Sequence, residues 1–343
     1  MKKVCLIELY NMHHECLYSQ LLYLRSSGYE VSLVCDFRNA NQTDRFSELT
    51  RQIRYDDFRK IKSLFRLRRF LIKEGFDTVI FNTAQSSRVA RLLLLPFPRR
   101  ISFIGTIHNL RKLTDSFDQR IIFRKIKRFY LLAEYLLPTF ISLSGKRDLR
   151  AQPYSSSIFP PVKLQTLEKT TGECWIVVPG SIEYKRRDYE FLLDLAGNSA
   201  LSPSVRFVLL GNATRSEGPS FIQKVKDLKL SEHFVWFEDF VPEETFQAYI
   251  QVADYLLPLI HGEKALEDYS LYKVSGTFVL AEAFGKILLC PEHFSKVPNF
   301  QYKAIYYKNI DHLIELTKVL QPDQITSKID MNKAREQYIS FLS

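Results

Sequence analysis

The chain has 343 residues, of which 46% are hydrophobic, so it can bury a large core, and its length favours two domains over one. Its five cysteines are scattered and show no Cys-x-x-Cys or Cys/His spacing, which argues against a zinc site and predicts free thiols in a reducing compartment. The net charge of +10 is unevenly divided, since residues 1–150 hold 28 Lys and Arg against 14 Asp and Glu, and the remainder holds 20 against 24. The basic first half is therefore expected to face an anionic partner.

The first half alternates short apolar runs with helical patterns. An apolar run over 3–9, a helical pattern that stops at Gly28 and a second apolar run over 29–35 predict a strand–helix–strand unit, which is typical of a parallel sheet covered by helices. Further strands, with helical segments between them, are predicted at 78–81, 101–107 and 140–143. We predict that this half is one doubly wound domain.

A second series of the same kind follows the break at Phe159-Pro160-Pro161. Its strands are predicted at 174–178, 206–210, 234–237, 253–258 and 287–290, and its helices at 188–196, 220–228, 242–251 and 275–284. The predicted fold class is therefore α/β, with two doubly wound Rossmann-like domains that face a cleft. We assign 1–160 to the first domain, 161–172 to a linker, 173–325 to the second domain, and 326–343 to a C-terminal helical segment that crosses back to the first domain.

The segment from Lys273 to Pro291 has the pattern of a phosphate-binding helix start. The small residues Ser275, Gly276 and Thr277 open a short helix, whose free N–H groups and dipole attract an anion. Glu282 lies one to two turns into that helix, within reach of sugar hydroxyls rather than phosphate. A nucleoside diphosphate would fit this segment, with its phosphates at the helix start and its sugar at Glu282. An ordinary N-cap and an exposed helix carboxylate are the alternative explanation of the same residues.

These elements resemble the two-domain glycosyltransferases of the GT-B fold, in particular the group-1-like, family-4-like branch. The resemblance covers mostly residues 175–291 and is carried by the order of five elements. They are Val-Val-Pro-Gly-Ser-Ile-Glu-Tyr-Lys-Arg-Arg-Asp-Tyr at 177–189, Arg-Phe-Val-Leu-Leu-Gly-Asn at 206–212, the segment 235–241, Ala-Asp-Tyr-Leu-Leu-Pro at 253–258, and the 275–282 helix start.

The resemblance implies roles for residues of the second domain. Gly180 would allow close approach of a nucleotide-sugar donor, and Lys185, Arg186 or Arg187 would neutralise its diphosphate, with the choice among the three left open. Ser275, Gly276 and Thr277, with Lys273 beside them, would complete the phosphate site, and Glu282 would accept hydrogen bonds from the ribose. A solvated basic turn is the alternative interpretation of residues 185–187.

The resemblance also implies roles for residues of the first domain. His108, at the end of a predicted strand, would lie near the donor sugar, where it would act as a base or hydrogen-bond the sugar. A loop with His13, His14 and Glu15 occupies the place where these enzymes meet the acceptor, so we count His14 and Glu15 as candidate catalytic residues. A buried strand-end histidine is the alternative for His108.

One position departs from the family pattern. Family-4 enzymes often carry two glutamates eight residues apart, and Val274 stands eight residues before Glu282. The sequence therefore leaves the stereochemistry and the donor sugar open.

The resemblance favours a glycosyltransferase that moves a sugar from a UDP- or GDP-sugar to a hydroxyl of a glycan acceptor in cell-surface polysaccharide biosynthesis. The acceptor is expected to be lipid-linked. No Asp-x-Asp motif is present, and the expected chemistry requires neither a metal nor another cofactor. A non-catalytic, transferase-like protein that binds nucleotide sugars or glycans is the alternative. A nucleic-acid binder is disfavoured because no recognition motif accompanies the basic charge.

The sequence shows no signal peptide and no apolar run of about 20 residues, which a spanning helix would need. We therefore expect a cytoplasmic protein that touches the inner face of the cell membrane. Two basic segments rich in aromatic residues, 51–70 and 120–135, are predicted to be amphipathic helices that contact anionic lipid. In the alternative interpretation, their apolar faces belong to the core and their charges are solvated.

Overall fold

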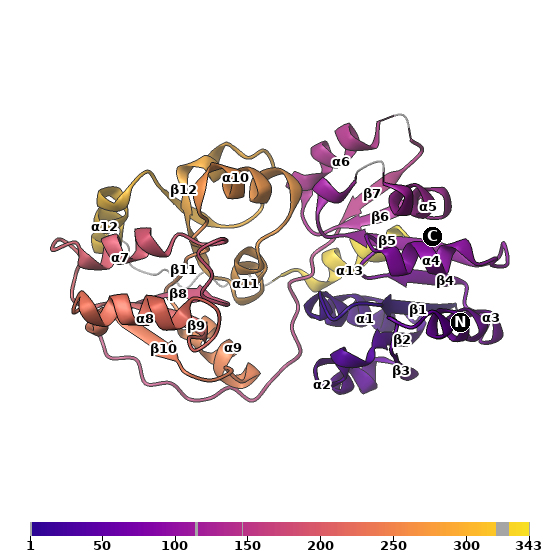
Figure 1. Ribbon diagram of the computed structural model, residues 1–343, viewed down its shortest axis with the longest axis horizontal. Coiled ribbons are helices and arrows are strands. Elements are labelled where there is room, and N and C mark those ends of the chain that lie inside the picture. Colours follow the sequence, from indigo (N-terminus) through magenta and orange to yellow (C-terminus); the bar gives the residue numbers. More distant parts are fainter. Residues whose placement is uncertain (1, 114–115, 146, 320–328, 343) are drawn as a thin grey trace. The chain divides into compact units, whose positions relative to one another are not determined.

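The computed structural model describes residues 2–113, 116–145, 147–319 and 329–342. They form two compact units, shown in Figure 1. Unit 1 comprises Met1–Phe159, Leu271–Val274 and Asp330–Ser343, and unit 2 comprises Pro160–Ser270 and Ser275–Ile329. The end of the predicted second domain, 320–325, and the first residues of the predicted C-terminal segment, 326–328, lie outside the described residues.

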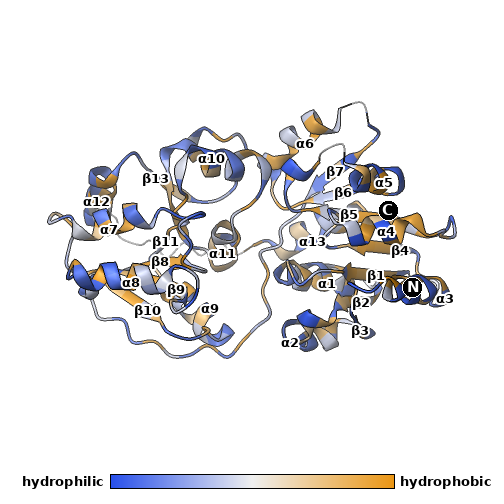
Figure 2. Ribbon diagram, in the orientation of Figure 1, coloured by the Kyte–Doolittle hydropathy of each residue, from blue (hydrophilic) through white to orange (hydrophobic). Residues whose placement is uncertain are grey.

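Unit 1 is built on a seven-stranded parallel sheet with the order β3-β2-β1-β4-β5-β6-β7. The interiors of its central strands are apolar and buried because helices cover both faces of the sheet. Figure 2 shows these strands as hydrophobic ribbons. The strands are β1 (Lys3–Glu8), β2 (Glu30–Asp36), β3 (Gln52–Asp56), β4 (Thr78–Phe81), β5 (Ser102–Ile107), β6 (Arg128–Leu131) and β7 (Arg150–Pro153).

The helices of unit 1 divide between the two faces of its sheet. The chain moves from β1 to β2 in one direction and from β3 onward in the other, so right-handed crossovers place the connecting helices on opposite faces. Accordingly, α3 (Ile61–Lys73), α4 (Ser87–Leu94) and α5 (Phe117–Lys125) pack side by side, and α1 (Leu17–Ser26) packs against α13 (Met331–Ser340).

The C-terminal helix α13 belongs to the core of unit 1 through Tyr338. The Tyr338 ring is fully buried and stacks on Tyr130 with 4.4 Å between ring centroids, and Tyr23 and Tyr154 contact its other sides. The Tyr130 hydroxyl donates to the Tyr338 carbonyl over 2.6 Å. The end of the chain therefore completes the hydrophobic core of the N-terminal sheet.

Unit 2 repeats the architecture with a six-stranded parallel sheet in the order β10-β9-β8-β11-β12-β13. Its helices are α7 (Tyr189–Gly197), α8 (Gly218–Asp227), α9 (Glu243–Val252), α11 (Gly276–Phe284) and α12 (Ile310–Val319). The helices α7, α8 and α12 contribute side chains to one continuous apolar core, and α9 packs against α11. The strands are β8 (Cys174–Pro179), β9 (Val205–Asn212), β10 (Phe234–Phe237), β11 (Tyr255–Leu256), β12 (Ile287–Pro291) and β13 (Ala304–Tyr307). The predicted fold class, two doubly wound α/β domains, is confirmed.

Three predicted elements are wrong in unit 1. Residues 140–143 are not a strand but part of the helix α6 (Leu137–Ser144), which begins with Pro138 in its first turn, where the missing N–H of proline costs no hydrogen bond. The basic segment 51–70 is divided between the edge strand β3 and the helix α3. The basic segment 120–135 is divided between α5 and the buried strand β6.

Two of the strands that the sequence did not predict, β3 and β7, lie at the two edges of the sheet and share a simple property. Edge strands β3 and β7 have alternating polar residues and half-buried side chains, so they lack the apolar run that marks a central strand. Within the described part of the chain, no helix has both the length and the apolar composition needed to cross a membrane.

Candidate functional site

In unit 2, the predicted donor loop begins at Gly180, directly after β8. Gly180 has φ +98°, a conformation that favours glycine, and a Cβ added there would lie 2.9 Å from Nη2 of Arg187. The Arg187 backbone is fixed by a hydrogen bond from its N–H to the Glu183 carbonyl and by a bridge to Ile260. The guanidinium of Arg187 is therefore held directly over the Gly180 backbone.

The three neighbouring basic residues have different surroundings. Lys185 is exposed, and Arg186 is 66% exposed with Glu183 3.7 Å away. Nη1 of Arg187, in contrast, is buried and has no hydrogen-bond partner among the residues that the structure describes. An unpaired buried cationic donor is costly, so a bound anion would remove that cost at Arg187 and not at the other two positions.

The helix α11 brings the second group of predicted donor residues to the same edge of the sheet. It leads into β12, so it runs antiparallel to the strands and begins at their carboxyl ends, where Gly180 also lies. Ser275 caps the helix by accepting the Thr277 N–H over 3.3 Å. The Thr277 hydroxyl is buried without a partner in the described ranges, and a Cβ added at Gly276 meets nothing within 4 Å.

The remaining predicted donor residues are placed differently. Lys273 belongs to unit 1, where its carbonyl accepts a hydrogen bond from the Tyr135 hydroxyl over 3.1 Å. Ser275, Gly276 and Thr277 belong to unit 2. Glu282 lies half-buried in the second turn of α11, on the same helix as the serine cap.

In unit 1, a buried carboxylate organises the carboxyl ends of β1 and β4. Glu8 accepts hydrogen bonds from the Tyr10 N–H (2.8 Å), Asn82 Nδ2 (2.7 Å) and Thr83 Oγ1 (2.6 Å). Asn82 in turn donates to the His13 carbonyl and accepts from Gln20. Burial raises the pKa of Glu8 to about 7, because its three hydrogen bonds offset only part of the loss of solvation.

His108 follows β5 and lies beside this network. Its Nε2 is 2.7 Å from the Asn82 carbonyl, which can only accept, so Nε2 carries the proton and Nδ1 holds the lone pair. Its ring stacks on His13 with 3.8 Å between centroids. Burial, followed by the charge of His13, lowers the pKa of His108 to about 3. His108 is therefore a neutral hydrogen-bonding group at neutral pH and a weak base.

The N-terminal loop supplies His13, rather than His14, to this pair. His13 adopts a left-handed conformation with φ 58°, which turns its ring onto His108, and its Nδ1 lies 3.4 Å from Oε1 of Glu15. Burial acts to raise the pKa of Glu15, but the hydrogen bond with His13 and the charge of His13 hold that pKa below its usual range. His14 is half-buried in the short turn that follows.

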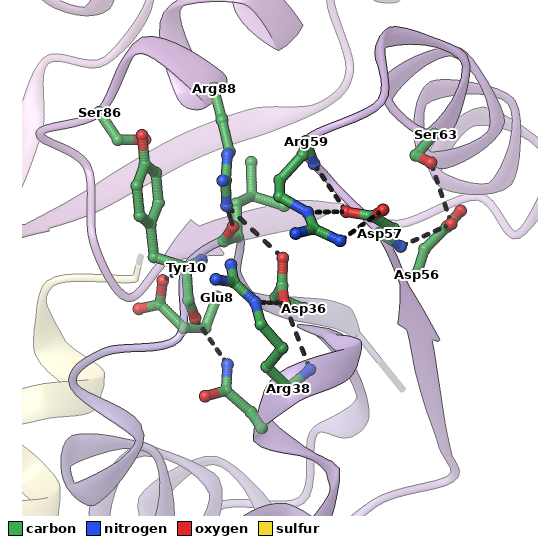
Figure 3. A network of polar contacts seen from close by, with 12 residues as sticks. Glu8, Tyr10, Asp36, Arg38, Asp56, Asp57, Arg59, Ser63, Ser86 and Arg88 are labelled. Atoms are coloured by element: carbon green, nitrogen blue, oxygen red, sulfur yellow. Dashed lines mark hydrogen bonds and ion pairs between the residues drawn. The ribbon is translucent and has the colours of Figure 1, made fainter.

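A cluster of arginines lies at the carboxyl ends of β1 and β2, as Figure 3 shows. The fully buried carboxylate of Asp36 pairs with Arg38 Nε over 2.7 Å and with Arg88 Nη1 over 3.5 Å. Arg88 also stacks on the Tyr10 ring at 4.1 Å and donates to the Leu9 carbonyl. These contacts fix the two loops that flank the Glu8 network.

Sequence reasoning missed Glu8, Asn82, Thr83 and Asp36, although a signal was present. Each of them is a polar residue at or directly after the carboxyl end of an apolar strand, and such ends meet at one edge of a parallel sheet. Among the described residues, no group of three or more His, Cys, Asp and Glu side chains is arranged to hold a metal ion.

The two parallel sheets of seven and six strands, with helices between the strands, match the GT-B fold, and known structures agree. Anabaena Alr3699/HepE in complex with UDP and glucose has a TM-score of 0.67 at 12% identity, covering 100% of this chain and 99% of that one. A putative UDP-N-acetylglucosamine 2-epimerase from Listeria monocytogenes has a TM-score of 0.62 at 10% identity, covering 99% and 91%. A glycosyltransferase from Rickettsia africae has a TM-score of 0.59 at 11% identity, covering 100% and 94%.

No protein-family model and no curated protein sequence matches the chain. The likeness therefore resides in the fold, and the chemistry has to be argued from the residues of this chain.

Proposed function

We propose that the protein is a glycosyltransferase that takes a sugar from a nucleoside-diphosphate donor and passes it to a hydroxyl of a glycan acceptor. The observation that carries the proposal is the buried, unpaired Nη1 of Arg187 over the Gly180 loop, at the same sheet edge as the start of α11. Both features suit a diphosphate. UDP is the favoured nucleotide because the Anabaena protein of the same fold forms complexes with UDP and UDP-glucose.

In this proposal the bond between the sugar C1 and the diphosphate oxygen breaks, and a bond from C1 to the acceptor oxygen forms. The electron pair of the broken bond remains on the diphosphate, where Arg187 and the N–H groups of α11 stabilise it. The acceptor proton leaves to the departing diphosphate or to solvent. His108 holds a lone pair at Nδ1 and, with its low pKa, is assigned to hydrogen-bond a sugar hydroxyl rather than to remove that proton.

The donor site is tested by measuring the melting temperature of the full chain with UDP, GDP, ADP, CMP and dTDP. A ligand that binds only the folded state raises the melting temperature, by an amount that grows with concentration over Kd. We expect UDP to give the largest rise. If none of the five nucleotides raises it, the donor-site proposal fails.

For the acceptor we propose a glycan on a lipid carrier at the inner membrane face, and the outer face of α3 supports it. Ile61 and Phe65 are 66% and 54% exposed, one turn apart, beside the exposed Lys62 and Arg69. Exposed apolar groups among cations suit an anionic lipid surface.

The test is sedimentation of the protein with vesicles of phosphatidylglycerol or of phosphatidylcholine. The membrane contact is supported if the parent protein sediments with phosphatidylglycerol vesicles, the Ile61→Ser/Phe65→Ser variant does not, and the Leu228→Ser variant of unit 2 still does. Equal sedimentation of all three proteins contradicts it.

A second candidate function is binding of a nucleotide sugar without transfer. Val274, at the position where the related pattern has a glutamate, and the low pKa of His108 favour it. The measurement is release of free UDP from UDP-glucose and UDP-N-acetylglucosamine, with and without glycan acceptors. Tight UDP binding with no release under any condition would favour the binding protein over the transferase.

A further inference from the structure

A polar pocket of about 280 Å³ lies within unit 1, next to the His108 loop. This volume is close to the lower end of the range for small-molecule sites, roughly 300–1,000 Å³. Its walls come from the loop after β4, the turn after β5 and the first turn of α5. Its lining includes Gln85, Ser86, Lys112, Ser116, Asp118 and Gln119.

Two helices begin at this pocket, and each begins with a capping serine. Ser86 accepts the Val89 N–H at the start of α4 over 3.2 Å, and Ser116 accepts the Gln119 N–H at the start of α5 over 3.3 Å. Helix starts carry partial positive charge, which here adds to the exposed cations Arg111 and Lys112. Asp118 is the carboxylate among the described lining residues, and the Arg111 guanidinium lies 4.1 Å from the centroid of the Tyr272 ring, so Lys112 is the cation assigned to the ligand.

Gln119 gives an independent indication of what the pocket binds. Its side chain is buried, with 3% of the residue exposed, and its Nε2 has no hydrogen-bond partner within the part of the chain described. A side-chain amide has two N–H donors, and leaving them unpaired in a protein interior is unfavourable. Gln119 is one of the residues that line the pocket, so an acceptor atom of a ligand bound there is the candidate partner for this donor.

One residue connects the pocket to the proposed reaction centre. Gln85 lines the pocket, and its Oε1 accepts the backbone N–H groups of His108 and Asn109, both over 3.0 Å. Its Nε2 donates back to the Asn109 carbonyl over 2.6 Å. A ligand in the pocket would thus lie beside the side chain that fixes the backbone of His108.

We propose that this pocket binds a phosphate or diphosphate group of the acceptor, with Gln119, Lys112 and the first turns of α4 and α5 as its donors. The assignment of that group to the acceptor rests on the proposed glycosyltransferase function, whereas the anion site itself does not. An acceptor that carries its sugar on a phosphate would be positioned by this group, with its sugar hydroxyls toward His108 and His13.

The experiment is calorimetric titration of the full chain with inorganic pyrophosphate at constant ionic strength. UDP at saturation blocks the donor site of unit 2 in a second set of titrations. We expect pyrophosphate to bind in the presence of UDP, and expect Gln119→Leu and Lys112→Gln each to weaken this binding about tenfold. Lys125→Gln, at the exposed far end of α5, is the matched control and should leave it unchanged.

Binding that is equal in the parent protein and both pocket variants overturns the proposal. Because Gln119→Leu removes an unpaired donor, it should not lower the melting temperature, and Lys112→Gln changes only an exposed side chain. Titration of UDP into the same variants separates the two proposals. If the parent protein binds pyrophosphate but does not bind UDP, the donor-site proposal fails and the pocket proposal is still supported.

A short isoprenoid diphosphate distinguishes the sources of the anion. Farnesyl diphosphate that binds more tightly than pyrophosphate, and is sensitive to Gln119→Leu, identifies a lipid-linked acceptor. Equal affinity for both compounds identifies a site for the phosphate group alone.

Discussion

The carboxyl edges of the two sheets carry polar groups of opposite kinds. In unit 1, the buried carboxylates Glu8 and Asp36 are surrounded by donors and cations of the same unit. In unit 2, the donors Arg187 Nη1 and Thr277 Oγ1 are buried without acceptors in the described ranges. The first arrangement holds loops in place, and the second leaves donors for a ligand.

Supporting residues and binding residues on one fold can be distinguished by whether their buried polar atoms already have partners. A buried polar atom that already has its partners stabilises the local structure, and removing it costs folding free energy. A buried donor without a partner is tolerated when a ligand supplies the acceptor during function. Variants at the two edges should therefore change different observables.

The largest effect is expected for Tyr338→Ala, which removes the buried ring that supports unit 1. Truncation of a large buried aromatic side chain costs about 3–5 kcal/mol of unfolding free energy. The Tyr338 hydroxyl also donates to Gln20, which donates to Asn82 in the Glu8 network. Denaturant unfolding should show the loss, and Met331→Ala, exposed on the same helix, should change it little. An unchanged midpoint would contradict the central role of α13.

Arg187→Ala should have the next largest effect, on ligand affinity instead of stability. Removing one partner of a buried charge-assisted contact costs about 2–5 kcal/mol, so UDP affinity should fall by at least about 30-fold. Arg186→Ala is the matched control, because Arg186 is 66% exposed. Calorimetric titration gives both affinities, and an equal loss in the two variants would remove Arg187 from its assigned role.

The pH dependence of stability should separate Glu8 from His108. The raised pKa of Glu8 contributes stability below about pH 4.5 that is lost as the pH rises toward 7. The lowered pKa of His108 contributes stability above about pH 6.5 that is lost as the pH falls toward 3. Between pH 4.5 and 6.5 the two contributions have opposite slopes and largely cancel.

Single variants should expose each slope. Glu8→Gln should leave an unfolding free energy that rises with pH in this window, by up to about 1.4 kcal/mol per pH unit. His108→Asn should give the opposite slope. Urea unfolding at several pH values measures both, and identical slopes in the two variants would refute the assignment of these groups.

The smallest effect is expected for Gly276→Ala at the start of α11. A Cβ there meets no atom within 4 Å, so stability should rise by about 0.5 kcal/mol through the more restricted unfolded chain. A diphosphate at the helix start would occupy that space, so UDP affinity should fall several-fold. Gly197→Ala in α7 is the control for stability without a change in affinity. Unchanged UDP affinity in Gly276→Ala would place the phosphate elsewhere.

Most of the fold could be predicted from the sequence because its signals are local. The strand at 78–81 was predicted with the bounds found, and Ser275 was predicted to open α11. The edge strands β3 and β7 and the helix α6 were not predicted, since their pairing and burial depend on neighbours that lie far away in the chain.

The site divides in the same way. Local patterns in the sequence predict two parallel doubly wound sheets, a glycine loop followed by three cations, and a helix that begins with small residues. It took the folded structure to show that Arg187, among those cations, covers Gly180, and that His13 rather than His14 stacks on His108. The physical reason is that hydrophobic period and turn residues fix local conformation. Which of several adjacent side chains becomes buried depends on the packing of segments that are distant in sequence.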